Sequence, residues 1–145
     1  MNGLDTPSGL RTRHLRIGWW ALFVFALLGV ILEALHGFKV AAYLDASNEP
    51  RRLLWRLAHA HGIGLSLVHV AFAFTAGAMP SAPRWASPCL TGALLAMPAG
   101  FFLGGLSPVG GDPGAGIVLV PLGAVLLLVA IGTTARATRA AGYGD

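Results

Sequence analysis

Long apolar runs alternate with short polar linkers along this chain. Four runs of mostly apolar residues lie at about 17–43, 53–78, 87–106 and 116–135. A helix needs about 20 such residues to cross the hydrocarbon core of a bilayer. The linkers carry Pro, Gly, Asn and Asp, which favour turns and end helices. The pattern predicts an all-α fold: residues 1–145 form one integral membrane domain, a bundle of four transmembrane helices.

The first apolar run follows a basic segment, as the apolar part of a secretory signal would. A signal peptide has an apolar stretch of about 7–15 residues before its cleavage site. The run here already exceeds that length between Ile17 and Leu32, and it continues to Leu44. We therefore expect a retained transmembrane helix.

Charged residues are few, and the arginines gather at the ends of the apolar runs. Only 11% of the residues are charged, against about 25% in an ordinary soluble domain. The net charge is +4, but no basic face interleaved with aromatic residues is present, so we expect no nucleic-acid partner. The excess of arginine on one side predicts that both termini are cytoplasmic, in the inner (plasma) membrane. The arginines on that side are Arg11, Arg13, Arg16, Arg84, Arg136 and Arg139.

The third and fourth runs contain no ionisable side chain in their apolar spans. They are rich in small residues, and the third contains Gly100-x-x-x-Gly104. Small residues let helices approach closely in lipid. We interpret this spacing as close packing within the monomer, with a dimer contact as the alternative.

Polar residues interrupt the end of the first run, in the stretch LEALHGFKVAAYLD at residues 32–45. Glu33, His36 and Lys39 stand at three-residue intervals. On a helix of 3.6 residues per turn they share a sector of roughly 120°. The first helix is therefore predicted to present one polar stripe toward a neighbour.

The second run carries a polar stripe of its own. It contains Arg52, Arg56, His59, Ser66 and His69. His61 lies roughly 160° around the helix from His59, so the two imidazoles cannot bind one ion together. One of them is expected to face the first helix, and the other a different neighbour.

Four of these side chains are predicted to lie at one depth. With a rise of about 1.5 Å per residue and antiparallel helices, Glu33, His36, His59 and His61 share a level in the outer half of the bilayer. His69 would lie far below them, with a separate role. Ionisable groups inside a membrane are costly and frequently mark functional sites.

Our leading hypothesis is a haem or metal site for electron transfer. Imidazole ligates haem as well as copper, iron and zinc. His36 and His59, on facing helices, are suited to clamp a haem b, with neighbouring glycines leaving room for the macrocycle. Glu33 and His61 are the further candidates for cofactor or metal ligands. The residues expected to support the site are Lys39, Arg52, Arg56, Ser66 and His69.

Two alternatives stay open. A glutamate beside histidines is also suited to handling protons or a quinone. The polar groups could instead hold helices in register, with Glu33 paired to Lys39, Arg56 or a neutral histidine. The protein would then be a non-catalytic accessory subunit in the lipid bilayer, within a larger membrane complex or a homo-oligomer. No hydrolase or phosphate-binding motif is present, and the single cysteine excludes an internal disulfide.

The segment Leu57-Ala58-His59-Ala60-His61-Gly62 resembles a segment of small bacterial four-helix membrane proteins. Those proteins in turn look like fragments of haem–copper oxidase subunit I. The resemblance covers about six to ten residues and implies that His59 and His61 are haem or metal ligands. The oxidases carry ligand histidines on several helices, whereas the third and fourth runs here have none. The resemblance therefore implies a single ligand site and not a complete oxygen-reducing centre.

Overall fold

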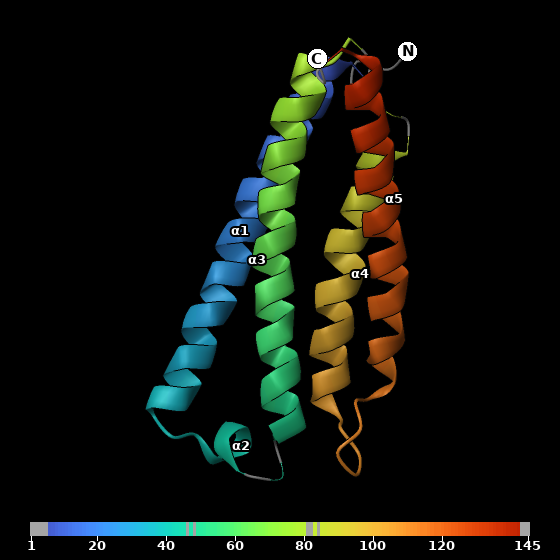
Figure 1. Ribbon diagram of the computed structural model, residues 1–145. Helices are drawn as coiled ribbons and strands as arrows, with labels where there is room; N and C mark the ends of the chain where they lie inside the picture. The colour runs from blue at the N-terminus through green and yellow to red at the C-terminus, as the bar shows by residue number, and fades with distance from the viewer. Residues whose placement is uncertain (1–5, 46, 48, 81–82, 84, 143–145) are drawn as a thin grey trace.

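The computed structural model describes residues 6–45, 47, 49–80, 83 and 85–142. Four long helices run lengthwise, and both termini lie at the same end, opposite the short helix α2 (Figure 1). All four are long and apolar enough to cross a membrane, as the sequence predicts. The long helices are α1 (Pro7–Gly37), α3 (Glu49–Ala78), α4 (Ala86–Leu106) and α5 (Leu119–Ala140), and the short ones are α2 (Ala41–Leu44) and the 3₁₀ helix η3 (Ala115–Val118).

The first helix begins ten residues earlier than predicted. The side chain of Thr6 accepts a hydrogen bond from the Gly9 amide, and Pro7 occupies the first helical turn. Both features favour a helix start, because they satisfy or remove backbone N–H groups that have no partner inside the helix. The basic segment before residue 17 therefore belongs to α1.

The same helix also ends earlier than predicted, at Gly37 instead of about residue 43. The Val40 amide donates to the Leu35 carbonyl at 3.0 Å, and the Lys39 amide donates to the His36 carbonyl at 3.2 Å. These two bonds form a Schellman motif, which requires a left-handed residue just beyond the helix. Lys39 takes that conformation, with φ of 53°. Lys39 is thus part of a turn and does not extend the polar stripe of α1.

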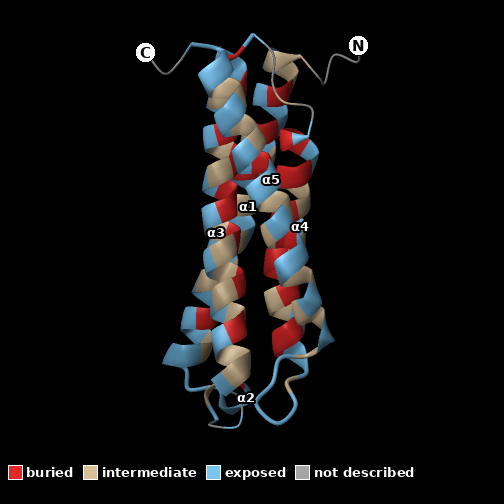
Figure 2. Ribbon diagram, turned by 45° about the vertical axis from the view of Figure 1, so that its right-hand side comes forward, coloured by how far each residue is buried: buried red, intermediate tan, exposed pale blue. Residues whose placement is uncertain are grey.

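The helices are arranged so that α3 and α4 form the centre. Helix α1 packs against α3, and α5 packs against α4. In the apolar windows of α1 and α5 only 11% of the residues are buried, against 39% and 50% in α3 and α4. Figure 2 shows the buried residues turned toward the neighbouring helices. The outer helices therefore present long apolar faces, of the kind that lipid covers.

Close contacts at small residues set the register of α1 on α3. A Cβ at Gly18 would lie 3.0 Å from the Ser66 carbonyl oxygen. The ring of Phe25 lies directly over Gly62, where a Cβ would overlap it. The two backbones can approach only because these positions lack side chains. This contact zone is called the α1–α3 seam below.

Glycines also bring α4 and α5 together. A Cβ at Gly100 would lie 2.9 Å from the Val120 amide, and one at Gly123 would lie 2.9 Å from the Met97 amide. Gly104 faces Ile117 at 3.5 Å. The Gly100-x-x-x-Gly104 spacing therefore serves packing within the monomer, as we expected.

The arginines separate along the axis of the bundle. Those in the first turns of α1 and the last turns of α5 lie at the end with the termini, whereas Arg51 and Arg52 lie at the α2 end. Arg84, which we also predicted to lie on the cytoplasmic side, is outside the described residues. The asymmetry that predicts orientation is thus present in the folded chain.

Gly100→Val tests the α4–α5 packing. The new side chain would meet backbone atoms of Val120, so we expect the free energy of unfolding in detergent to fall by about 1–3 kcal/mol. Gly132→Val is the control, because a Cβ at Gly132 has no atom within 4 Å. Equal melting temperatures for the two variants would contradict the packing.

Lys39→Gly tests the turn after α1. Glycine adopts the left-handed conformation without steric conflict, so we expect stability to rise by up to about 1 kcal/mol. Lys39→Ala is the control, because it removes the ammonium group but keeps the Cβ. If alanine stabilises the protein as much as glycine does, the charge and not the backbone is responsible.

Candidate functional site

A cavity of about 430 Å³ lies at the α2 end of the α1–α3 seam. Its size falls within the range of small-molecule and cofactor sites, about 300–1,000 Å³. Three of the four predicted ligand residues line it, together with Arg56. The lining residues are Gly29, Leu32, Glu33, His36, Gly37, Tyr43, Arg56 and His59.

A hydrogen bond and a close contact with α1 position the side chain of His59 in this cavity. Its Nδ1 lies 2.7 Å from the Phe25 carbonyl oxygen. Because a carbonyl only accepts, Nδ1 carries the hydrogen, and the neutral ring keeps its lone pair on Nε2. Proteins orient metal-binding histidines in this way, through a hydrogen bond from the second ring nitrogen. The ring rests on Gly29, where a Cβ would overlap Cε1.

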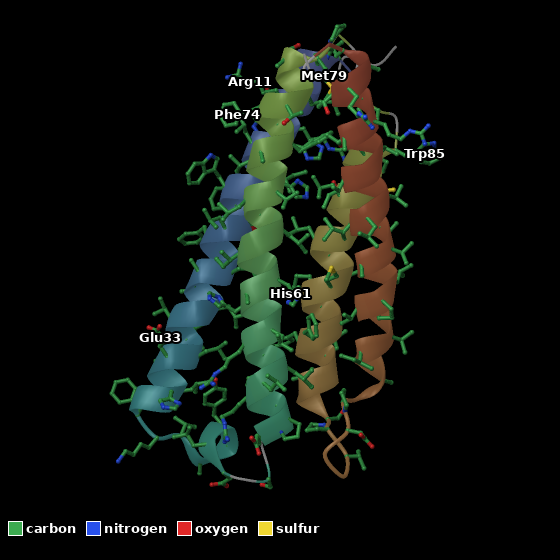
Figure 3. The ribbon with its side chains drawn as sticks, in the orientation of Figure 1. Arg11, Glu33, His61, Phe74, Met79 and Trp85 are labelled. Atoms are coloured by element: carbon green, nitrogen blue, oxygen red, sulfur yellow. The ribbon has the colours of Figure 1, made fainter. Side chains whose placement is uncertain are left out.

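His36 and Glu33 reach the cavity from the last two turns of α1. Both are exposed in the isolated chain, and Figure 3 shows Glu33 on the outer side of α1. Among the described residues Glu33 forms no ion pair or hydrogen bond. The pairing of Glu33 with Lys39, Arg56 or a histidine, one of our alternatives, is therefore not formed.

Arg52 is engaged in structure and not in the cavity. Its guanidinium donates to the carbonyls of Tyr43, Leu44 and Asp45, at 3.2, 2.7 and 3.1 Å. Those carbonyls end α2, where a cation is favourable. Arg51 similarly joins α2 to the end of α4, through Ala42 and Gly105. Of the basic residues predicted to support the site, only Arg56 lines the cavity.

His61 faces away from this cavity, as its angular separation from His59 predicts. Its Nδ1 donates to the Leu57 carbonyl at 2.8 Å, and its ring lies 4.7 Å from the ring of Phe101 on α4. Figure 3 shows it on the side of α3 toward α4. The four predicted ligands therefore do not converge. Within the described part of the chain, no three His, Cys, Asp or Glu side chains form a group suited to a metal ion.

The glycines near the histidines have a different use from the one predicted. Gly29 accommodates the His59 ring, and Gly62 accommodates the Phe25 ring. Both positions are therefore filled by side chains of the neighbouring helix. At Gly37 and Gly64 a Cβ would meet nothing within 4 Å, and Gly37 also lines the cavity.

A second histidine group lies at the end with the termini. From the sequence we singled out His69 of this group but not His14. His14 Nδ1 lies 2.8 Å from His69 Nδ1, and His14 Nε2 lies 2.8 Å from Ser87 Oγ. His69 Nε2 lies 3.2 Å from the Leu90 carbonyl oxygen. Both imidazoles are completely buried. The group joins α1, α3 and α4, and is called the His14–His69–Ser87 chain below.

The hydrogen positions in this chain follow from its one fixed acceptor. The Leu90 carbonyl only accepts, so His69 Nε2 carries a hydrogen. With both rings neutral, His69 Nδ1 then accepts from His14 Nδ1, and the Ser87 hydroxyl donates to His14 Nε2. Every ring nitrogen has a partner, which is what a buried polar group requires. Ser66, predicted to support the ligand site, instead donates to the Gly62 carbonyl at 2.6 Å.

His14 was missed because it stood in the basic segment that we placed before the first helix. The relevant signal is nevertheless present in the sequence. His14, Gly18, Phe25, Gly29 and His36 follow one another at intervals of four and seven residues, which places them on one helical face. A helix wound back to Pro7 would have put His14 on the same face as His36.

Comparisons of the chain with family models, with curated proteins and with solved structures gave no match.

His14→Ala and His69→Ala test the buried chain. Each leaves a buried ring nitrogen without its partner, and we expect a loss of about 1–3 kcal/mol in unfolding free energy. The double variant should lose less unfolding free energy than the two single variants lose together, because the two side chains share one hydrogen bond. Leu128→Ala, at an exposed position of α5 that lines none of the cavities described, serves as the control. Strict additivity in chemical unfolding would show that the two imidazoles are not coupled.

Proposed function

We propose that this protein spans the inner membrane with both termini cytoplasmic and holds a haem b in the cavity at the α2 end. Four sufficiently long apolar helices support the membrane location. The arginines at the terminal end support the orientation. The cavity would then lie in the outer half of the bilayer.

The orientation of His59 is the observation that carries the haem proposal. Its Nδ1–H is held by the Phe25 carbonyl, so the Nε2 lone pair could bind the iron of a haem. His36, which also lines the cavity, is the second candidate ligand. Arg56 is the cation that lines the cavity, where it is suited to the carboxylates of a haem.

The number of ligands favours haem over a bare metal ion. A protein-bound zinc ion normally takes three or four protein ligands. Haem iron needs only one or two from the protein, because the macrocycle supplies the others. The cavity offers two imidazoles, and no larger metal-binding group exists among the described residues. Two imidazole ligands would leave no open position on the iron, which suits electron transfer.

Purification after expression with haem supplementation tests the proposal. We expect a Soret band with about one haem per chain in mild detergent, lost in His59→Ala. His61→Ala is a matched control. His61 lies on the same helix and also donates from Nδ1 to a backbone carbonyl, but it lies outside the cavity. Equal loss of haem in both variants would place the site elsewhere.

A second result would reject haem altogether. A colourless, metal-free protein that co-purifies with a larger complex would favour the accessory-subunit alternative. Metal analysis on the same sample separates haem iron from a bare copper, iron or zinc ion. Gly29→Val offers an independent check, since its side chain would displace the His59 ring without removing a ligand.

A further inference from the structure

One nitrogen of the His61 ring has no hydrogen-bond partner in the part of the chain that the structure describes. Its Nδ1 donates to the Leu57 carbonyl, so the neutral ring keeps a lone pair on Nε2. No described residue donates a hydrogen bond to Nε2. His61 stands twelve residues after the start of the 30-residue helix α3, which places it about 18 Å along that helix. It therefore offers a hydrogen-bond acceptor near the middle of the bundle.

The side chain of His61 lines an apolar groove. The groove has a volume of about 340 Å³ and runs between α3 and α5. Apart from His61, it is lined by Ala60, Gly64, Leu65, Val68 and Leu127. It lies on the opposite side of α3 from His59, so it is separate from the proposed haem cavity.

A second groove adjoins the first at Val68. It has a volume of about 300 Å³ and continues between α3 and α5 toward the end with the termini. The hydroxyls of Thr75, Thr134 and Thr138 line it, but each donates to a carbonyl of its own helix. The two grooves together form a long apolar surface with a hydrogen-bond acceptor, His61 Nε2, near one end.

We propose that this surface binds a lipid-soluble quinol. Its hydroxyl would donate to His61 Nε2, and its apolar tail would lie along the adjoining grooves. A ligand at mid-bundle depth has to enter sideways from the lipid, which a hydrophobic tail permits. The site stands independently of the haem proposal, because it uses no residue of that cavity.

The chemistry of the acceptor predicts which redox form is bound. A quinol carries hydroxyl hydrogens, whereas the matching quinone presents only carbonyl acceptors toward an acceptor nitrogen. One hydrogen bond of ordinary strength corresponds to about tenfold in affinity. We therefore expect the quinol to bind about tenfold more tightly than the quinone.

Anaerobic titration of the full chain in lipid nanodiscs tests this proposal, with decylubiquinol and decylubiquinone as the probes. His61→Ala should weaken quinol binding about tenfold and abolish the preference for the reduced form. His36→Ala should remove haem but leave the quinol affinity and the preference for the reduced form unchanged. The quinol proposal and the haem proposal can therefore fail independently of each other. Circular dichroism and gel filtration establish that each variant is folded.

Two further measurements sharpen the outcome. Gly64→Leu should weaken both redox forms, because its side chain would enter the groove at a position where a Cβ meets nothing within 4 Å. Decylbenzene has a ring and an apolar tail but no hydroxyl to donate to His61 Nε2, so it should compete poorly. Absence of saturable quinol binding, equal affinity for the quinone, or equal competition by decylbenzene would each overturn the proposal.

Discussion

The close approach of α1 to α3 is the contact on which the other features of the structure depend. It exists because Gly18 and Gly62 leave room for the facing backbone and for the Phe25 ring. Within this seam His14 meets His69 at one end, and His59 meets the Phe25 carbonyl toward the other. A shift of one turn would remove each of these partners, so the packing of small residues and the polar contacts specify the same register.

The polar side chains inside the bundle divide into two groups by whether their hydrogen bonds are complete. In the His14–His69–Ser87 chain every ring nitrogen has a partner, and the group is fully buried. His59 and His61 each use only Nδ1, and their Nε2 atoms remain available. Complete networks stabilise a fold, whereas an available acceptor beside a cavity is suited to a ligand. This difference supports a packing role for the first group and the binding roles that we propose for the second.

Periodicity and hydropathy predicted the helices well but the residues between them poorly. The four apolar runs appear as four long helices, and the opposite directions of His59 and His61 follow from winding alone. The role of Lys39 could not be predicted, because left-handed residues after a helix are usually glycine. The role of Arg52 depends on where α2 folds back, which no local pattern indicates. His14 required knowing that α1 begins at Pro7.

The lengths of the helices differ, and this places the buried chain at a particular height. Helix α4 has 21 residues, about 31 Å, which is close to the thickness of the hydrocarbon core. Helix α1 has 31 residues, about 46 Å, so its first turns extend beyond that core. Ser87 is the second residue of α4, and it bonds His14. In a bilayer matched to α4, these two side chains therefore lie where hydrocarbon gives way to lipid head groups, shielded from both by the surrounding helices.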